Sequence, residues 1–250
     1  MIPPRHDLAA LARTFAIDGR VQVPDFLEPT LAERLHQRIA SWPEWALVTR
    51  IGGQHRSFDA AGMDALEPDR RSAFEALVAA EARAGFQYLY ERIPLYDLGR
   101  VGRLHDTVLA EAWELLRSAA FLGLARQLAG APGIAFADGQ LTRYRRGHFL
   151  TLHDDHADGA GRVAAFVLNL TPAWAADFGG QLQFTDAGGR VVEAIAPRFN
   201  TLTLFAVPRP HLVTAVAPFV SGSRYALTGW LRSGAEVALP QPAEAAPSAA

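Results

Sequence analysis

From residue 135 onward the chain alternates apolar and polar positions with the period of two that is typical of β-strands. Gly, Pro, Asn and Asp separate the alternating stretches at short intervals. Short strands punctuated in this way favour a β-sandwich or barrel. The eight predicted strands lie near residues 135–143, 148–153, 162–170, 180–186, 190–196, 200–206, 211–216 and 223–232.

The first half of the chain shows helical spacing instead. Pro29 and Thr30 precede a segment in which Leu31, Leu35 and Ile39 recur on one helical face. The predicted helices lie near residues 7–16, 28–41, 68–84, 105–117 and 118–129, and Gly130 is placed to end the last of them.

Two β elements are predicted among these helices. Residues 20–27 predict a short strand, and residues 45–59 predict a hairpin whose turn is Gly52-Gly53. Residues 86–95 mix strand and turn signals. We expect residues 1–134 to form a helical and β-hairpin support that packs on a β-core of residues 135–233. The Ala/Pro-rich tail, residues 234–250, has little to bury and predicts disorder.

The composition is ordinary for a soluble globular protein: 250 residues, half of them hydrophobic and a fifth charged. A net charge of −2 gives no basic field for nucleic acid or an anionic membrane. The lack of cysteine excludes a disulfide framework and thiolate ligands. No apolar run approaches the roughly 20 residues of a membrane span, and the N-terminus lacks a hydrophobic signal core, so we expect a cytoplasmic protein.

Candidate metal chemistry begins at His153 and Asp155, which form an H-x-D motif. In a strand, residues i and i+2 point to the same face. A second imidazole from a distant strand would complete the two-His-one-carboxylate triad of non-haem iron, which leaves coordination positions open for oxygen chemistry. Our candidate for that imidazole is His211. His148 and His156 flank the motif, and we place both outside the ligand set.

Arg224 follows His211 by thirteen positions (224 − 211), in a predicted strand that is mostly apolar. A buried guanidinium needs an anion, because an unpaired buried charge is very costly. A dicarboxylic cosubstrate would supply one. Thr228 and Trp230 share the alternation phase of Arg224 and should line the same pocket.

Together these features resemble the 2-oxoglutarate- and Fe(II)-dependent oxygenases, and within them the prolyl-4-hydroxylase-like branch. The matching motifs are H-D-D at 153–155, G-R-V-A-A-F-V-L-N-L-T-P-A-W at 161–174, G-G-Q-L at 179–182, P-R-F-N at 197–200, His211, and R-Y-A-L-T-G-W at 224–230. The H-D-D form is similar to the branch that hydroxylates a prolyl residue in a ribosomal protein.

The resemblance implies a double-stranded β-helix, or jelly-roll, core. It implies His153, Asp155 and His211 as catalytic iron ligands, with Arg224 holding the distal carboxylate of 2-oxoglutarate. It also places Tyr144 in the cosubstrate pocket. Asn169 stands where the oxygen-sensing prolyl hydroxylases carry a tyrosine that assists the arginine; Asn also donates a hydrogen bond but has a shorter reach.

The implied activity is hydroxylation of an unactivated C–H bond, with a prolyl residue in a protein or peptide as the favoured substrate. Fe(II), 2-oxoglutarate and dioxygen would be consumed or cycled, succinate and CO2 released, and ascorbate is a candidate reductant. Related halogenases lack the carboxylate ligand, so Asp155 favours hydroxylation. The chain has no Lys, so only Arg is available to hold the cosubstrate.

Other functions stay open from the sequence. The site would also suit a hydroxylase of a free amino acid or small metabolite, or a non-catalytic β-helix that binds 2-oxoglutarate or metal. An HD-type phosphohydrolase at His153-Asp154 ranks low, since those motifs lie on helices, and so does a cupin-type site. The oligomeric state is not indicated.

Two further groups have a structural and a functional interpretation. Tyr88, Tyr90, Arg92 and the hairpin near Trp42 and Trp45 would suit either a substrate groove or core packing, and packing is favoured. The glycine pair at 179–180 is assigned to structure, because it permits a sharp turn or a close backbone approach.

Overall fold

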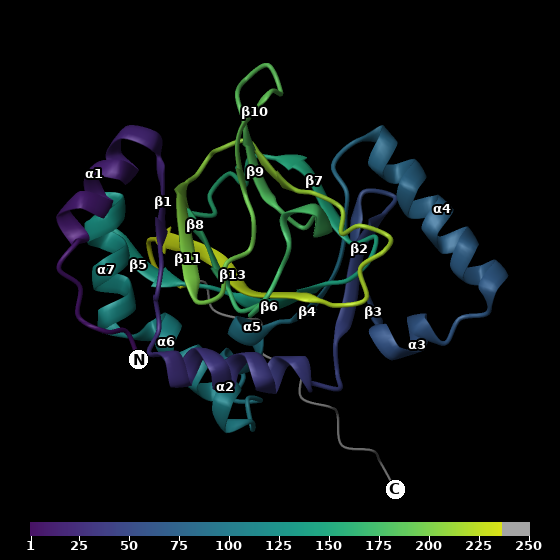
Figure 1. Ribbon diagram of the computed structural model, residues 1–250, viewed down its shortest axis with the longest axis horizontal. Coiled ribbons are helices and arrows are strands. Elements are labelled where there is room, and N and C mark those ends of the chain that lie inside the picture. Colours follow the sequence, from purple (N-terminus) through teal and green to yellow (C-terminus); the bar gives the residue numbers. More distant parts are fainter. Residues whose placement is uncertain (237–250) are drawn as a thin grey trace, which may run out of the picture.

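The computed structural model describes residues 1–236, and the β-strands dominate it (Figure 1). Most of the predicted disordered tail therefore lies outside the described residues. The strands are β1 (Arg20–Val23), β2 (Ala46–Ile51), β3 (Gln54–Asp59), β4 (Tyr88–Ile93), β5 (Ile134–Ala137), β6 (Gln140–Tyr144), β7 (Phe149–His153), β8 (Arg162–Asn169), β9 (Leu182–Thr185), β10 (Val191–Ile195), β11 (Thr201–Ala206), β12 (His211–Val213) and β13 (Arg224–Ser233).

Seven α-helices and one 3-10 helix accompany these strands within residues 1–236. They are α1 (Leu8–Asp18), α2 (Pro29–Ala40), α3 (Ala60–Asp64), α4 (Pro68–Ala84), α5 (Leu95–Arg100), α6 (Thr107–Arg117), α7 (Ala119–Ala129) and η1 (Ala176–Phe178). No helix in this described part of the chain is both long and apolar enough to cross a membrane.

The strands form one curled antiparallel sheet that closes part-way into a barrel (Figure 1). Its order is β1-β11-β8-β13-β6-β4-β7-β12-β9-β10, with the β2–β3 hairpin added at β4 and β5 added at β13. Strand β4 pairs with both β6 and β7. Strand β4 therefore links one side of the barrel, β1-β11-β8-β13-β6, to the other side, β7-β12-β9-β10.

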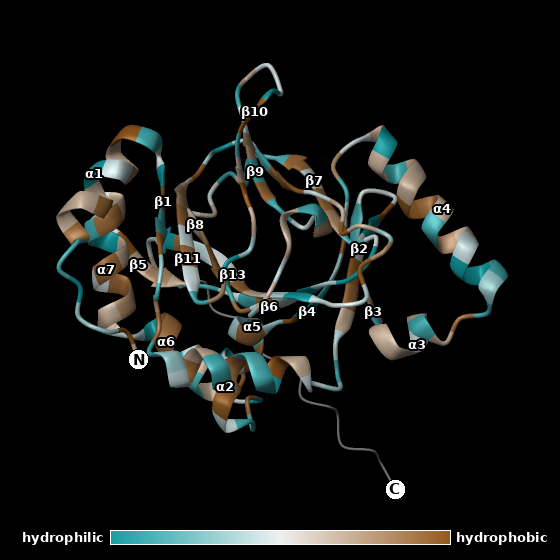
Figure 2. Ribbon diagram, viewed as in Figure 1, coloured by the Kyte–Doolittle hydropathy of each residue, from teal (hydrophilic) through white to brown (hydrophobic). Residues whose placement is uncertain are grey.

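Alternation on the central strands separates a helix-facing core from the barrel interior. Leu168 of β8, Leu204 of β11 and Leu227 of β13 belong to the main core cluster, which they share with buried residues of α1, α2, α6 and α7. Figure 2 shows the mixed apolar and polar surface of α2 that such one-sided packing requires. The intervening positions point inward, and they include Ala165 and Phe205, which form a smaller cluster inside the barrel.

The predicted helices and most predicted strands occur with ends shifted by a few residues. The hairpin turn at Gly52-Gly53 is confirmed, because Ile51 pairs with Gln54. Gly130 ends α7 in the left-handed conformation, with φ 60°. Short helices α3 and α5 were not predicted. The main core cluster contains residues from both sides of position 134, and the division of the chain at that position stays a prediction.

One strand prediction was wrong: residues 135–143 form two strands, β5 and β6, interrupted at Asp138 and Gly139. Asp138 Oδ1 accepts a hydrogen bond from the Trp230 backbone N–H at 2.9 Å. The Asp138 carbonyl approaches Gly229 so closely that a Cβ there would lie 1.9 Å from it. The break therefore depends on a cross-strand contact that the local sequence does not report.

Candidate active site

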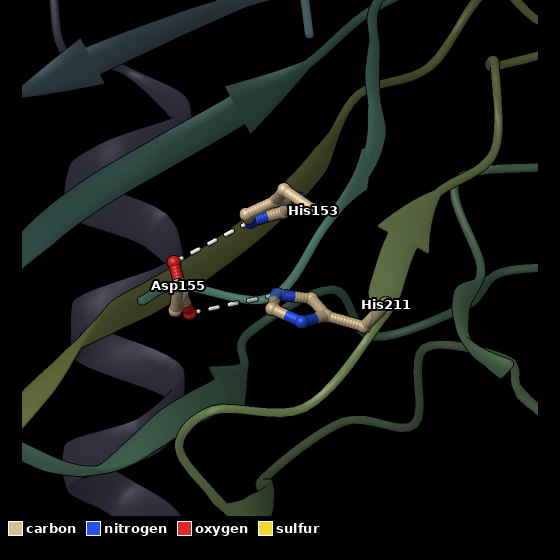
Figure 3. A group of neighbouring side chains, drawn as sticks. All are labelled: His153, Asp155 and His211. Atoms are coloured by element: carbon tan, nitrogen blue, oxygen red, sulfur yellow. Dashed lines mark ion pairs between the residues drawn. The ribbon is translucent and has the colours of Figure 1, made fainter. Parts of the chain in front are cut away.

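The structure brings His153, Asp155 and His211 together beside the pairing of β7 with β12 (Figure 3). One donor atom from each side chain lies within 4.8 Å of the others. The Nε2 atoms of His153 and His211 lie 3.4 Å and 3.5 Å from the two carboxylate oxygens of Asp155. Two imidazoles and one carboxylate facing a common point are a donor set that suits Fe(II).

Backbone contacts fix which ring nitrogen of each histidine faces that point. His153 Nδ1 lies 2.9 Å from the Thr151 carbonyl, and His211 Nδ1 lies 2.8 Å from the Arg209 carbonyl. A carbonyl only accepts, so each Nδ1 carries the proton and each Nε2 keeps its lone pair. In metal proteins, a hydrogen bond donated by the ring nitrogen that does not bind the metal orients the imidazole ligand in this way.

Asp155 reaches the site by a different route from the one predicted. Strand β7 ends at His153, and Asp155 lies in the following loop with φ 63°. This left-handed conformation is uncommon for a residue other than glycine, although Asp tolerates it better than most. Strained residues that persist in a structure cluster at functional sites. The carboxylate is therefore aimed by a turn, and not by strand alternation.

Electrostatics favour the protonation states that a metal requires at His211 and Asp155. Burial lowers the pKa of His211 to about 4, and the neighbouring His153 adds to this effect. Burial on its own would raise the pKa of Asp155, but the contact with His153 and the charges of both imidazoles outweigh it and lower the pKa below 3.8. At neutral pH the site therefore offers a neutral imidazole at His211 and an ionised carboxylate.

These side chains lie in a pocket of about 530 Å³ that also contains Arg224. Arg224 is 3% exposed. Its Nε has no hydrogen-bond partner. Its Nη2 donates a long hydrogen bond to Asn169 Oδ1, at 3.5 Å. No carboxylate of residues 1–236 forms an ion pair with it. A buried cation without a counter-ion fits a carboxylate ligand in the pocket.

The other residues predicted for this pocket surround Arg224. Tyr144 lines the pocket, and its ring centroid lies 5.1 Å from the Arg224 guanidinium carbon. Thr228 and Trp230 line the same pocket further along β13. Asn169 is buried beside Arg224 but lies outside the pocket lining of the described chain. Their roles toward a cosubstrate stay predictions.

Several pocket residues were missed or assigned to packing. Tyr88, Tyr90 and Arg92 line the pocket from β4, and Tyr90 also packs against the buried cluster that contains Tyr144. Trp45 has the packing role that was favoured for it, since it is 2% exposed in the core. Arg162 was missed. Its Nη1 donates to the Asp155 carbonyl at 2.9 Å, and its guanidinium carbon lies 3.7 Å from a Trp230 ring centroid.

The two flanking histidines stand apart from the donor group, which contains neither of them within the described chain. His156 is exposed and contacts Asp158 at 3.0 Å. His148 is buried and lines a second cavity, of about 830 Å³, below α4.

The glycine pair has the structural role predicted for it. A Cβ at Gly179, which has φ 72°, would lie 2.0 Å from the Ala215 carbonyl. A Cβ at Gly180 would lie 3.2 Å from Arg224 Cδ. Glycine here lets the chain pass closely beside the pocket arginine.

Comparison with known proteins agrees with this geometry. Residues 139–232 match the model of the family described as the 2OG-Fe(II) oxygenase superfamily. This segment is therefore similar to that superfamily. The match contains all three donors and Arg224, so the resemblance inferred from the sequence motifs is confirmed, and Fe(II) and 2-oxoglutarate fit the oxygenase site.

Individual relatives of this oxygenase segment include prolyl hydroxylases. A mouse prolyl 3-hydroxylase is 32% identical over 100 residues, which are 37% of this chain and 18% of the mouse protein. The chain thus matches less than a fifth of that relative's length.

Two solved structures cover most of the chain. A prolyl-4-hydroxylase from Pseudomonas putida superposes with a TM-score of 0.56 at 21% identity, over 91% of this chain and 100% of that one. A prolyl hydroxylase from Trichoplax adhaerens, in complex with a hypoxia inducible factor oxygen degradation domain peptide fragment, has a TM-score of 0.60 at 18% identity, over 90% and 89%. At such identities the likeness shows the fold, and it confirms the predicted mostly-β jelly-roll class with supporting helices.

Proposed function

We propose that the protein is an Fe(II)- and 2-oxoglutarate-dependent dioxygenase that hydroxylates an unactivated C–H bond, with a prolyl residue of a protein or peptide as substrate. The observation that carries this proposal is the pairing of two features in one pocket. A three-donor group suits Fe(II), and a buried guanidinium without a counter-ion suits the distal carboxylate of a keto diacid. The mouse and bacterial relatives support prolyl as the reacting residue.

Each residue has a defined part in this proposal. His153, Asp155 and His211 would hold the metal through Nε2, a carboxylate oxygen and Nε2. Arg224 would orient 2-oxoglutarate, and the ring of Tyr144, which burial keeps protonated by raising its pKa, would form an apolar wall against water. The bound iron supplies activation of dioxygen. Overall, the C–H bond and dioxygen with 2-oxoglutarate give the alcohol, succinate and CO2.

The test is an anaerobic titration of the protein with Fe(II) and then 2-oxoglutarate, followed by the visible charge-transfer band of an iron-chelated keto acid. The proposal expects the band in the wild type and its loss in Asp155→Ala. Aerobic incubation with prolyl peptides should then release succinate in step with hydroxylated peptide. Failure of iron or 2-oxoglutarate to bind would contradict the proposal. Binding without turnover of any C–H substrate would favour a binding protein instead.

A further inference from the structure

Arg92 is a second pocket guanidinium, separate from Arg224. In a strand, alternate side chains share one face, and Tyr88, Tyr90 and Arg92 of β4 all line the pocket. The intervening Glu91 is fully buried on the other face, where it pairs with Arg143 and Arg145. Strand β4 thus presents two phenol rings and one cation to the pocket.

The neighbours of Arg92 are neutral. Its Nη1 donates to Gln140 Oε1 at 3.3 Å, and its Nη2 lies 3.5 Å from His55 Nε2. Burial, and after it the charge of Arg92 itself, lowers the pKa of His55, so this imidazole is neutral at pH 7. The Nε of Arg92 is buried with no hydrogen-bond partner, and no carboxylate of residues 1–236 forms an ion pair with it.

The position of Arg92 separates it from the cosubstrate end of the pocket. Arg224 pairs with Tyr144 across β13 and β6, whereas Gln140, which Arg92 contacts, pairs with Thr228. Arg92 itself lies opposite Thr142 of β6, two residues from Tyr144, and its guanidinium reaches away from Tyr144 toward Gln140. The guanidinium of Arg224 instead lies beside Tyr144 and Asn169, so the two cations have no contact in common. Arg92 therefore keeps no ion-pair partner within the described chain when Arg224 holds 2-oxoglutarate.

The charge of the pocket favours an anionic substrate. Its lining contains the guanidiniums of Arg92, Arg162 and Arg224 and the carboxylates of Asp154 and Asp155, a formal balance of 3 − 2 = +1. The charge of Fe(II) and that of the 2-oxoglutarate dianion are equal and opposite, so binding both leaves that balance unchanged. Arg162 already has Asp155 at 3.9 Å, and Arg224 is assigned to 2-oxoglutarate, so Arg92 is the remaining pocket cation without an ion-pair partner within the described chain.

We propose that Arg92 binds a carboxylate of the substrate, so that the enzyme acts on a molecule with an acidic group near the reacting C–H bond. The inference rests on the proposed function. A planar carboxylate matches the fork of a guanidinium. The carboxylate belongs either to a free amino acid or to an acidic side chain in a peptide, and in both cases it pairs with the Arg92 guanidinium.

The experiment compares acids with their amides. The anaerobic Fe(II)–2-oxoglutarate complex is titrated with L-proline and L-prolinamide, and with the peptides acetyl-Ala-Pro-Asp-amide and acetyl-Ala-Pro-Asn-amide, while the visible band reports binding. We expect the acid of at least one pair to bind about tenfold or more tightly than its amide, the scale of a charge-assisted hydrogen bond. Preference within the first pair indicates a free amino acid, and preference within the second indicates an acidic peptide.

Variants assign the preference to Arg92. The tighter binding of the acid than of its amide should disappear in Arg92→Gln and persist in part in Arg92→Lys. The matched control is Arg56→Gln, on strand β3 of the adjoining hairpin, where the guanidinium is exposed and donates to Gln54 Oε1 at 2.7 Å. Equal binding of acid and amide by the wild type, no binding of either acid, or a preference that survives in Arg92→Gln would each overturn the inference while leaving the band, and so the proposed function, intact. Absence of the band would remove both.

Discussion

His211 lies directly opposite His153 in the antiparallel pair of β12 with β7, although the two are 58 positions apart in the chain (211 − 153). Their ring centroids are 4.1 Å apart. Directly opposed side chains in an antiparallel pair lie close enough to interact, so strand register alone brings the two imidazoles together. The site therefore depends on the sheet for two donors and on the loop after β7 for the third.

Replacing Asp155 should abolish metal binding without unfolding the protein. Asp155→Ala removes the only carboxylate of the donor group found in the described chain and leaves two imidazoles. We expect Fe(II) affinity to fall by more than the 10–100-fold that loss of a ligand's hydrogen-bond partner costs. Isothermal titration under nitrogen measures the affinity, and circular dichroism checks the fold. The control is Asp158→Asn, whose side chain is fully exposed; an equal loss there would contradict the assignment.

Removing the buried charge of Arg224 should weaken 2-oxoglutarate binding without lowering the stability of the ligand-free protein. An unpaired buried cation is unfavourable, so Arg224→Met should melt at or above the wild-type temperature when 2-oxoglutarate is absent. Its affinity for 2-oxoglutarate should fall at least about tenfold, because a hydrogen bond to a charged group contributes roughly 1.5–3 kcal/mol. Ligand binding raises the melting temperature, so a thermal shift in anaerobic Fe(II) measures both effects.

The exposed Arg198 provides the control for that experiment. Arg198→Gln should keep the full shift with 2-oxoglutarate. If Arg224→Met instead lost stability in the absence of ligand and kept its ligand-induced shift, Arg224 would be a structural residue.

The sequence predicted the parts of the site that follow from strand periodicity. The shared face of Thr228 and Trp230 could be read from alternation along one strand, and both line the pocket. Arg162 could not be found in this way. Strict alternation would place Arg162 on the opposite face from Ala165. A register shift where β8 meets Leu231 and Arg232 of β13 adds one residue to β8 and brings Arg162 to the pocket face.

Other features depend on contacts between distant segments. The left-handed backbone of Asp155 depends on how the loop after β7 closes, and H-D-D alone does not report it. The segment around Tyr88 and Arg92 showed mixed strand and turn signals because β4 pairs with β2, β6 and β7 at once. Its side chains could be assigned to the pocket only when all three partner strands of β4 were known.

A methyl group at Gly179 should destabilise the fold. This residue has φ 72° and ψ −152°, a region that is accessible in practice only to glycine. A Cβ would also collide with the Ala215 carbonyl, so we expect Gly179→Ala to lower the free energy of unfolding by about 2–4 kcal/mol. Urea denaturation measures the change. At Gly222 a Cβ would meet nothing within 4 Å, and Gly222→Ala should stay within about 0.5 kcal/mol of the wild type.

His148 should make the protein less stable in acid. Burial lowers its pKa to about 3, and the guanidinium charges of Arg145 and Arg143 also lower it. A hydrogen bond with the Arg143 backbone and the charge of Asp64 raise the pKa, but by less. The unfolded chain takes up a proton near pH 6.5, whereas the folded protein does so only near pH 3. Between those values the unfolded state binds more protons, so the contribution is complete above about pH 6.5 and decreases as the pH falls toward 3.

The loss assigned to His148 between pH 7 and pH 5 is about 2 kcal/mol. His211 and other buried groups also titrate in acid, so the measurement is a difference between two proteins. Urea unfolding of the wild type and of His148→Gln is compared at pH 7, 6 and 5. The variant has no charge to bury, so the wild type should lose about 2 kcal/mol more than the variant over this range. Parallel losses in the two proteins would show that His148 takes up its proton in the folded state without penalty, and the acid sensitivity would then belong to other groups.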